Sequence, residues 1–166
     1  MTNPRRILGI DPGLAITGYG VLEFAQPRPI LCEAGIIRTA DDDAIDMASK
    51  VLSVHNGIVE VIAQFHPEAM AVEQLYSHYD HPRTAILMGH ARGVIFLAAA
   101  QKGIPVVSYA STQVKKIVTG NGRASKEQVQ RTIQREMGLA TMPEPPDVAD
   151  ALAVALCHYY QQKLAV

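Results

Sequence analysis

The chain has 166 residues, of which 48% are hydrophobic and 19% are charged, with 15 Lys and Arg against 16 Asp and Glu. This composition excludes disordered and fibrous proteins and predicts a single domain spanning residues 1–166. Two distant cysteines, Cys32 and Cys157, argue against a disulfide scaffold or a structural zinc site. No signal peptide is evident, and the most apolar stretch is too short for a clean membrane span, so we predict a cytoplasmic protein.

The first part of the chain alternates apolar runs with turn residues. The runs RRILGID, TGYGVLEF and PILCEAGIIRT predict three successive strands, paired antiparallel. Helical spacing of apolar residues from Ile45 to Phe65 then predicts a helix capped at 41–43 and ended by His66-Pro67.

The rest of the chain alternates strands and helices. EAMAVEQ and GIPVVSYA predict two further strands, the first of them central because it is apolar on both sides. A helix between them, from Thr84 to Lys102, carries Gly89 and Gly93, which suggest close packing on one face. Helices are predicted up to Gly120, after a capping Ser125, and after Pro146. This order predicts an α/β fold with a mixed five-stranded sheet and helices on both faces.

Two acids stand at the ends of predicted strands. Asp11 follows ILGI and precedes Pro12-Gly13. It could simply cap that turn, but an unpaired carboxylate at the end of a buried strand is unfavourable and indicates a metal- or phosphate-facing role. Glu73 ends AMAVE in the same way, at the edge where open α/β sheets bind ligands, although a plain surface position is the alternative.

Two more acids open the last helix, in the stretch PPDVADALAVAL. Asp147 and Asp150 are three residues apart and share one helix face. Asp147 could cap the helix while Asp150 favours its dipole. The alternating alanines that follow suggest a helix pressed against the sheet, which would bring this pair to the strand ends and to Asp11 and Glu73.

Four clustered carboxylates repel one another unless cations neutralise them. Oxygen ligands without nearby His or Cys favour Mg²⁺ or Mn²⁺ over zinc. Two such ions about 3.5–4 Å apart are typical of phosphodiester hydrolysis. The four acids therefore predict a two-metal hydrolytic site.

A basic segment precedes the acidic helix. Residues 111–136 hold six basic and two acidic residues, a net charge of +4, whereas the remainder of the chain carries −5. This polarity suits a phosphate backbone, although two solvated helix faces would explain it equally well. Tyr76, three residues after Glu73, could stack on an unpaired base or pack on the protein's own surface. The six scattered histidines show no metal-ligand pattern.

Taken together, these motifs resemble the RuvC family of Holliday junction resolvases over nearly the whole chain. The resemblance rests on five stretches in the expected order: ILGIDPGLAITGYGVLE, AVEQLY, GHARGVIFLAA, QVKKIVTGNGRASKEQV and DVADALAVALCH. It implies a ribonuclease H-like fold, a two-fold symmetric homodimer, and Mg²⁺-dependent cleavage of four-way junctions by paired nicks that leave 5′-phosphate ends. It also implies cooperation with the RuvA and RuvB branch-migration proteins.

The resemblance assigns roles to residues that match the family's motifs. The catalytic and metal-binding acids are then Asp11, Glu73, Asp147 and Asp150. Lys115 and Lys126 match DNA-contacting lysines, and Tyr76 takes the place of a junction-facing aromatic residue that is usually Phe.

One stretch departs from the family pattern, namely Asp80-His81-Pro82 in the connection that follows the aromatic residue. This departure bears on junction contacts and cleavage preference, not on the acids. Two other functions compete with a junction nuclease. Actin-like sugar kinases or chaperone ATPases share the strand–Asp–Gly opening but need a second lobe, which 166 residues cannot supply. A non-catalytic junction-binding module would not depend on Asp11 or Asp150.

Overall fold

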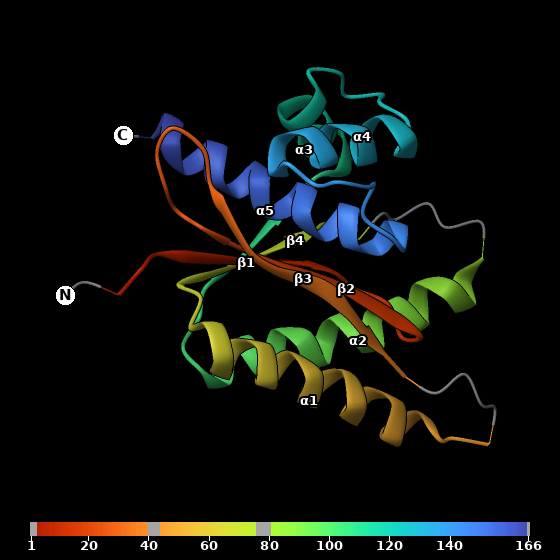
Figure 1. Ribbon diagram of the computed structural model, residues 1–166. Coiled ribbons are helices and arrows are strands. Elements are labelled where there is room, and N and C mark those ends of the chain that lie inside the picture. The colour runs from red at the N-terminus through yellow and green to blue at the C-terminus, as the bar shows by residue number, and fades with distance from the viewer. Residues whose placement is uncertain (1–2, 40–43, 76–80, 166) are drawn as a thin grey trace.

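The computed structural model describes residues 3–39, 44–75 and 81–165. Its centre is a five-stranded sheet with the order β3-β2-β1-β4-β5 (Figure 1). The strands are β1 (Arg6–Asp11), β2 (Ile16–Glu23), β3 (Ile30–Arg38), β4 (Ala69–Glu73) and β5 (Val106–Tyr109). The first three strands pair antiparallel, and β4 runs parallel to both β1 and β5, which confirms the predicted mixed sheet.

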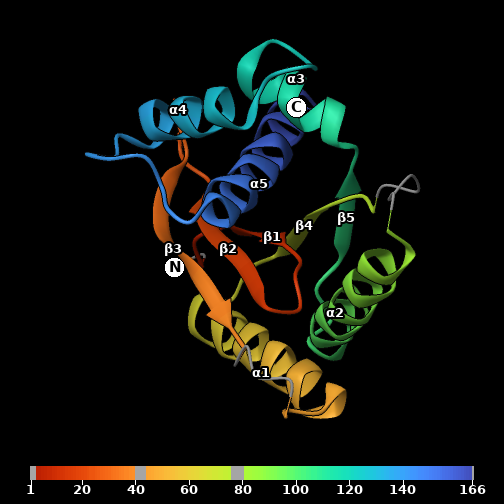
Figure 2. The same cartoon turned by 90° about the vertical axis from the view of Figure 1, so that its right-hand side faces the viewer.

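Helices cover both faces of this sheet (Figures 1 and 2). They are α1 (Met47–Phe65), α2 (Pro82–Gln101), α3 (Ser111–Thr119), α4 (Lys126–Met137) and α5 (Pro146–Leu164). α1 and α2 pack together on one face, α5 lies on the other, and α3 and α4 contact α5. α5 is therefore enclosed between the sheet and two further helices, which explains why apolar residues occupy nearly all of its sides.

Strand side chains divide between two cores. Ile7 on β1 and Ala71 on β4 belong to the core on the α5 side, whereas their neighbours Leu8 and Met70 belong to the core under α1 and α2. This alternation follows from the two-residue period of a strand. It fixes which face every later residue of β1 and β4 addresses.

Helix α1 begins later than predicted. Its N-cap is Asp46, whose side chain accepts the N–H of Ser49 at 2.7 Å. The predicted cap at 41–43 is wrong, and those three residues lie outside the described part of the chain. Leu52, which we placed on the apolar side, is 57% exposed, because the buried stripe runs through Val54 and Ile58 instead.

Helix α2 is much less covered than its sequence suggests. The predicted close packing at Gly89 and Gly93 is not found within one chain, because a Cβ added at either would meet no described atom within 4 Å. The buried side runs through Ala91, Ile95 and Ala98 instead. By length and composition, α2 alone among the described helices could cross a membrane; its buried side belongs to the core shared with α1 and the sheet.

Candidate active site

Asp11 and Glu73 lie at the same edge of the sheet and address the same face. Asp11 ends β1 and Glu73 ends β4, and these two strands are parallel neighbours. Asp11 is four residues after Ile7, and Glu73 is two after Ala71, so strand alternation directs both carboxylates toward α5. The predicted pairing of the two strand-end acids is thus supported by register and by facing.

Two glycines let α5 approach this edge. A Cβ at Gly9 would collide with the carbonyl of Ala151, and a Cβ at Gly18 would collide with that of Asp147. Gly18 is the β2 partner of Asp11 in the antiparallel register. The first turn of α5 therefore lies directly over the strand pair that ends in Asp11, as the alanine-rich pattern predicted.

Asp147 does not cap α5. The helix begins at Pro146, its N-cap is Pro145, and no side chain makes a capping hydrogen bond. The capping interpretation of Asp147 is therefore wrong, because the helix begins one residue earlier and Asp147 lies within its first turn. Asp147 and Asp150 are both half-buried, between fully buried neighbours such as Ala149 and Ala151. Both acids thus lie near the start of α5, where the helix dipole favours negative charge, and both are partly covered by the fold.

The acids interact strongly with one another. The pKa of Asp11 is raised from 3.8 to about 8, first by burial and then by three neighbouring carboxylates. Those neighbours, in decreasing order of effect, are Asp150, Asp147 and Glu73. The pKa of Asp150 is raised to about 6, again mainly by burial. Two acids with such values are the usual mark of a functional site, because burial of a like-charged cluster is otherwise unfavourable.

The basic segment folds against this acidic edge. Lys126 begins α4 and Lys115 lies in α3, and both helices contact α5. Lys126 lowers the pKa of both Asp11 and Asp150, and Lys115 lowers that of Asp150. The predicted cap at Ser125 is confirmed, because Ser125 and Gln128 exchange reciprocal hydrogen bonds. This capping box fixes the start of α4 and therefore the position of Lys126, its first residue.

Asp11 is coupled electrostatically to the other three acids, but the four do not form one closely spaced group. Within the residues that the structure describes, no three Asp, Glu, His or Cys side chains are grouped closely enough to hold one ion. The donors themselves are hard oxygens from rigid elements, a set that fits Mg²⁺ or Mn²⁺.

Other predicted and unpredicted residues complete the edge. Tyr76 and Asp80 lie outside the described residues, whereas His81 is the N-cap of α2 and Pro82 its first residue. Arg92 of α2 donates from Nη1 to the carbonyl of Glu73, a contact that we did not predict. No periodicity or charge pattern marks an arginine in an apolar helix as a neighbour of this strand end.

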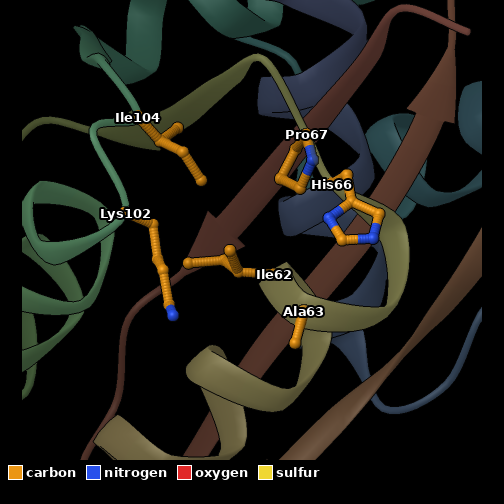
Figure 3. Close-up of a pocket in the computed structure, with 6 residues that line it drawn as sticks. All are labelled: Ile62, Ala63, His66, Pro67, Lys102 and Ile104. Carbon is orange, nitrogen blue, oxygen red and sulfur yellow. The ribbon is translucent and has the colours of Figure 1, made fainter. Parts of the chain in front are cut away.

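The opposite edge of the sheet offers a poorer site. A pocket of about 350 Å³ lies between the end of α1 and the residues that precede β4 and β5 (Figure 3). Its lining contains no carboxylate and consists of Ile62, Ala63, His66, Pro67, Lys102 and Ile104. The acidic edge is therefore the stronger candidate for catalysis.

Comparisons with known proteins identify the family of the chain. The family model described as crossover junction endodeoxyribonuclease RuvC matches residues 7–158. The protein of that name from Rhodopirellula baltica is 53% identical over 154 residues, covering 93% of this chain and 85% of the relative. The Moorella thermoacetica protein of that name is 49% identical and covers 92% of this chain and 89% of its own length.

Solved structures give the same result. The structure titled "T. thermophilus RuvC in complex with Holliday junction substrate" superposes with a TM-score of 0.89 at 33% identity, covering 97% of this chain and 96% of that one. The yeast mitochondrial Holliday junction resolvase shares the fold, with a TM-score of 0.69 at 14% identity over 99% of this chain and 82% of that one. The predicted ribonuclease H-like architecture is confirmed. The chain belongs to the RuvC family of crossover junction endodeoxyribonucleases.

Proposed function

We propose that this protein is an endonuclease that resolves four-way DNA junctions by paired symmetric nicks, leaving 5′-phosphate and 3′-hydroxyl ends, in recombination and DNA repair. One observation carries the proposal: three further acids, which come from β4 and α5, lie close enough to Asp11 to help raise its pKa to about 8. Membership of a family of metal-dependent junction nucleases supports the same activity.

The proposed catalytic and metal-binding residues are Asp11, Glu73, Asp147 and Asp150. We expect them to hold Mg²⁺, with Mn²⁺ as an alternative, and two ions in each site. When bound, such ions lower the pKa of water and offset charge on a phosphate. The protein contributes fixed positions: Asp11 sits on a central strand, and Asp150 on an enclosed helix. Asp11 must lose its proton to act as a ligand, and Lys126 favours that loss.

Lys115 and Lys126 are the proposed contacts to the DNA backbone. Both act on the acids through their charge, so a phosphate bound between α3, α4 and the acidic edge would meet both signs of charge at once. Tyr76, for which we propose stacking at the junction, lies outside the described residues. Junction shape rather than base contact would then supply much of the selectivity.

A stripe on α2 supports the proposed homodimer. Ile86, Gly89, Gly93 and Leu97 recur at helical spacing along one side, and all four are exposed. We call these four residues the α2 stripe. Ile86 is 60% exposed and Leu97 is 50% exposed, which is typical of a surface that another molecule covers. A two-fold pair built on this stripe would present equivalent sites to equivalent strands.

The wider setting follows from the family. We propose a cytoplasmic protein whose residues 1–166 act as one nuclease domain, working after RuvA and RuvB have moved the junction. The proposal includes no membrane partner.

The decisive experiment incubates a synthetic four-way junction with wild type, Asp11→Asn and Asp150→Asn in Mg²⁺. We expect symmetric nicks from wild type, and normal junction binding with cleavage reduced on the order of 10³-fold or more in both variants. Denaturing gels give the cut positions, and gel shift in chelator gives the binding. Cutting retained by both variants would contradict the acid assignment. Binding without nicking by wild type would favour a non-catalytic module, and nucleotide hydrolysis alone would favour the actin-like class.

The lysine assignment has its own test. Removing one phosphate contact should flatten the dependence of log affinity on log salt by about 0.9. We expect this for Lys115→Ala and not for Lys50→Ala, which loses the same charge from α1 on the far face of the sheet. Junction affinity is measured in chelator over a salt series. Equal slopes for wild type and Lys115→Ala would remove Lys115 from the DNA interface.

A further inference from the structure

The end of β4, which carries Glu73, is held by the sheet on one side only. The N–H of Gln74 donates to the carbonyl of Tyr109 on β5 at 2.8 Å. Because the N–H and C=O of one trans peptide point in opposite directions, the Glu73 carbonyl faces away from β5. On that side, the pairing of β1 with β4 ends at Ile10 and Val72. The ladder therefore stops one residue short of the Glu73 carbonyl.

Arg92 supplies a donor to this carbonyl from the other layer of the molecule. It lies on α2, on the face of the sheet opposite α5, and its Nη1 donates to the Glu73 oxygen. Its guanidinium also stacks over the ring of Phe96, one turn later, with the carbon 5.0 Å from the ring centroid. Neighbouring Ala91 and Ile95 are fully buried, so the helix that carries Arg92 is anchored at that level.

This arrangement fixes the backbone of Glu73 from two directions while its side chain faces a third. β5 holds the following N–H, Arg92 holds the carbonyl, and the carboxylate addresses α5. The chain leaves the sheet immediately afterwards, because Gln74 and Leu75 are exposed and belong to no strand. Without Arg92, the last residue of β4 would keep its hydrogen bonding to β5 but lose the donor at its carbonyl, and the carboxylate would be held less firmly.

We propose that Arg92 is a positioning residue that holds Glu73 in the orientation needed to bind a divalent ion. The inference rests on the proposed role of Glu73 as a metal-binding acid. Groups that orient metal ligands without touching the ion commonly change metal affinity or activity about 10- to 100-fold when removed. Arg92 contacts Glu73 at its backbone carbonyl, so this contact acts on the ion site through the geometry of Glu73.

The test compares Arg92→Met, which keeps an unbranched side chain but removes the guanidinium donor, with Arg92→Lys, which keeps a positive charge and a donor group. Binding of Mn²⁺ to DNA-free protein is followed by the loss of the free-ion signal in electron paramagnetic resonance. We expect about a 10-fold weaker ion affinity in Arg92→Met and recovery of part of that loss in Arg92→Lys. Junction affinity in chelator should stay within about 2-fold of wild type, since Arg92 acts on the ion site and not on the DNA.

Lys102→Met is the matched control, because it removes the same single positive charge at the end of the same helix. It should leave ion affinity unchanged. Unchanged ion affinity in Arg92→Met would overturn the proposal. A loss of junction affinity in chelator well beyond about 2-fold would also overturn it, because Arg92 would then act on DNA binding. Should Arg92→Met fail to fold, Arg92→Lys is judged by the same criterion of weaker ion binding at unchanged junction binding.

A double variant separates this inference from the proposed function. If Arg92 acts through Glu73, then Glu73→Gln combined with Arg92→Met should bind Mn²⁺ no more weakly than Glu73→Gln alone. Independent losses that add would overturn the positioning role. If Glu73→Gln by itself leaves ion affinity unchanged, the metal-binding assignment of Glu73 fails instead, which is a different result from failure of Arg92.

Discussion

Helices α5 and α2 are nearly equal in length and both apolar, yet their surroundings are opposite. Eleven of the 19 residues of α5 are buried, against four of the 20 residues of α2. α5 is enclosed by the sheet, α3 and α4, so the two acids at its start are held rigidly. α2 is covered along one side, touches the acidic edge through Arg92, and leaves the α2 stripe open. Enclosure suits the helix that positions chemistry, and partial cover suits the helix that meets a partner.

The glycines of the two regions express the same contrast. Gly18 faces α5 so closely that no Cβ fits beside the carbonyl of Asp147, whereas Gly89 in α2 has open space around it. Only the first is required by the packing of this chain. The same substitution, glycine to alanine, should therefore have opposite effects at the two positions.

Of the substitutions that test this contrast between glycines, Gly18→Ala is expected to have the largest effect. The added methyl group must push the first turn of α5 away from β2, which moves Asp147 and Asp150 relative to Asp11. We expect a stability loss of about 1–3 kcal/mol. Cleavage should fall about 100-fold, because displacements near 1 Å have such effects on catalysis. Urea unfolding and junction cleavage at saturating Mg²⁺ measure the two quantities.

Gly35→Ala on β3 serves as the control for this change. Its added Cβ would meet the hydroxyl of Tyr19 at 2.9 Å, the far end of a side chain that can move aside. We expect a smaller stability loss and near-normal cleavage. Equal losses of cleavage in Gly18→Ala and Gly35→Ala would mean that sheet stability, and not the seat of α5, limits activity.

Much of this architecture was accessible from sequence, and the reasons are physical. Strand alternation and glycine turns located all five strands, and the run of alanines correctly indicated a helix pressed on the sheet. The N-caps of α1 and α5 were predicted wrongly. The observed caps are Asp46 and Pro145, and nearby acids in the sequence looked equally suitable. The packing predicted at Gly89 and Gly93 is absent from the described part of one chain for a related reason. A glycine indicates where another segment could approach closely, but not whether a segment lies there.

The acidic site likewise contains residues that the sequence predicted and one that it did not. Strand ends and one helix face identified its acids, because carboxylates at such positions need an explanation. Arg92 was not predicted, because its acceptor is a backbone carbonyl 19 residues away. No sequence pattern indicates which carbonyl is left unpaired by the hydrogen bonding between strands.

A second prediction concerns pH in the absence of divalent ions. The folded state raises the pKa of Asp11 from 3.8 to about 8, so it binds the proton more tightly than the unfolded chain does. The favourable contribution of the protonated group is complete below pH 3.8 and is lost progressively as pH rises to about 8. Wild type in chelator should therefore lose stability, on the order of a few kcal/mol, across this range.

Asp11→Asn removes the titrating group and isolates its effect. Its stability in chelator should fall less with pH than that of wild type, so the variant becomes the more stable protein at pH 8. Mg²⁺ should restore wild type at pH 8, because ions bind the deprotonated acid. The comparison uses urea unfolding at pH 5 and pH 8. Equal changes in unfolding free energy between pH 5 and pH 8 for the two proteins would show that the fold does not raise the pKa of Asp11.

The smallest effect is expected at the open glycines of α2. Gly89→Ala adds a methyl group where no described atom lies within 4 Å, and alanine stabilises a helix interior by about 0.5–1 kcal/mol relative to glycine. Dilute protein should therefore unfold at higher urea. If the α2 stripe is the dimer contact, the same methyl group should weaken association in sedimentation at higher concentration. A loss of stability in the dilute protein would instead show that α2 is already covered within one chain, which would end the contrast with α5.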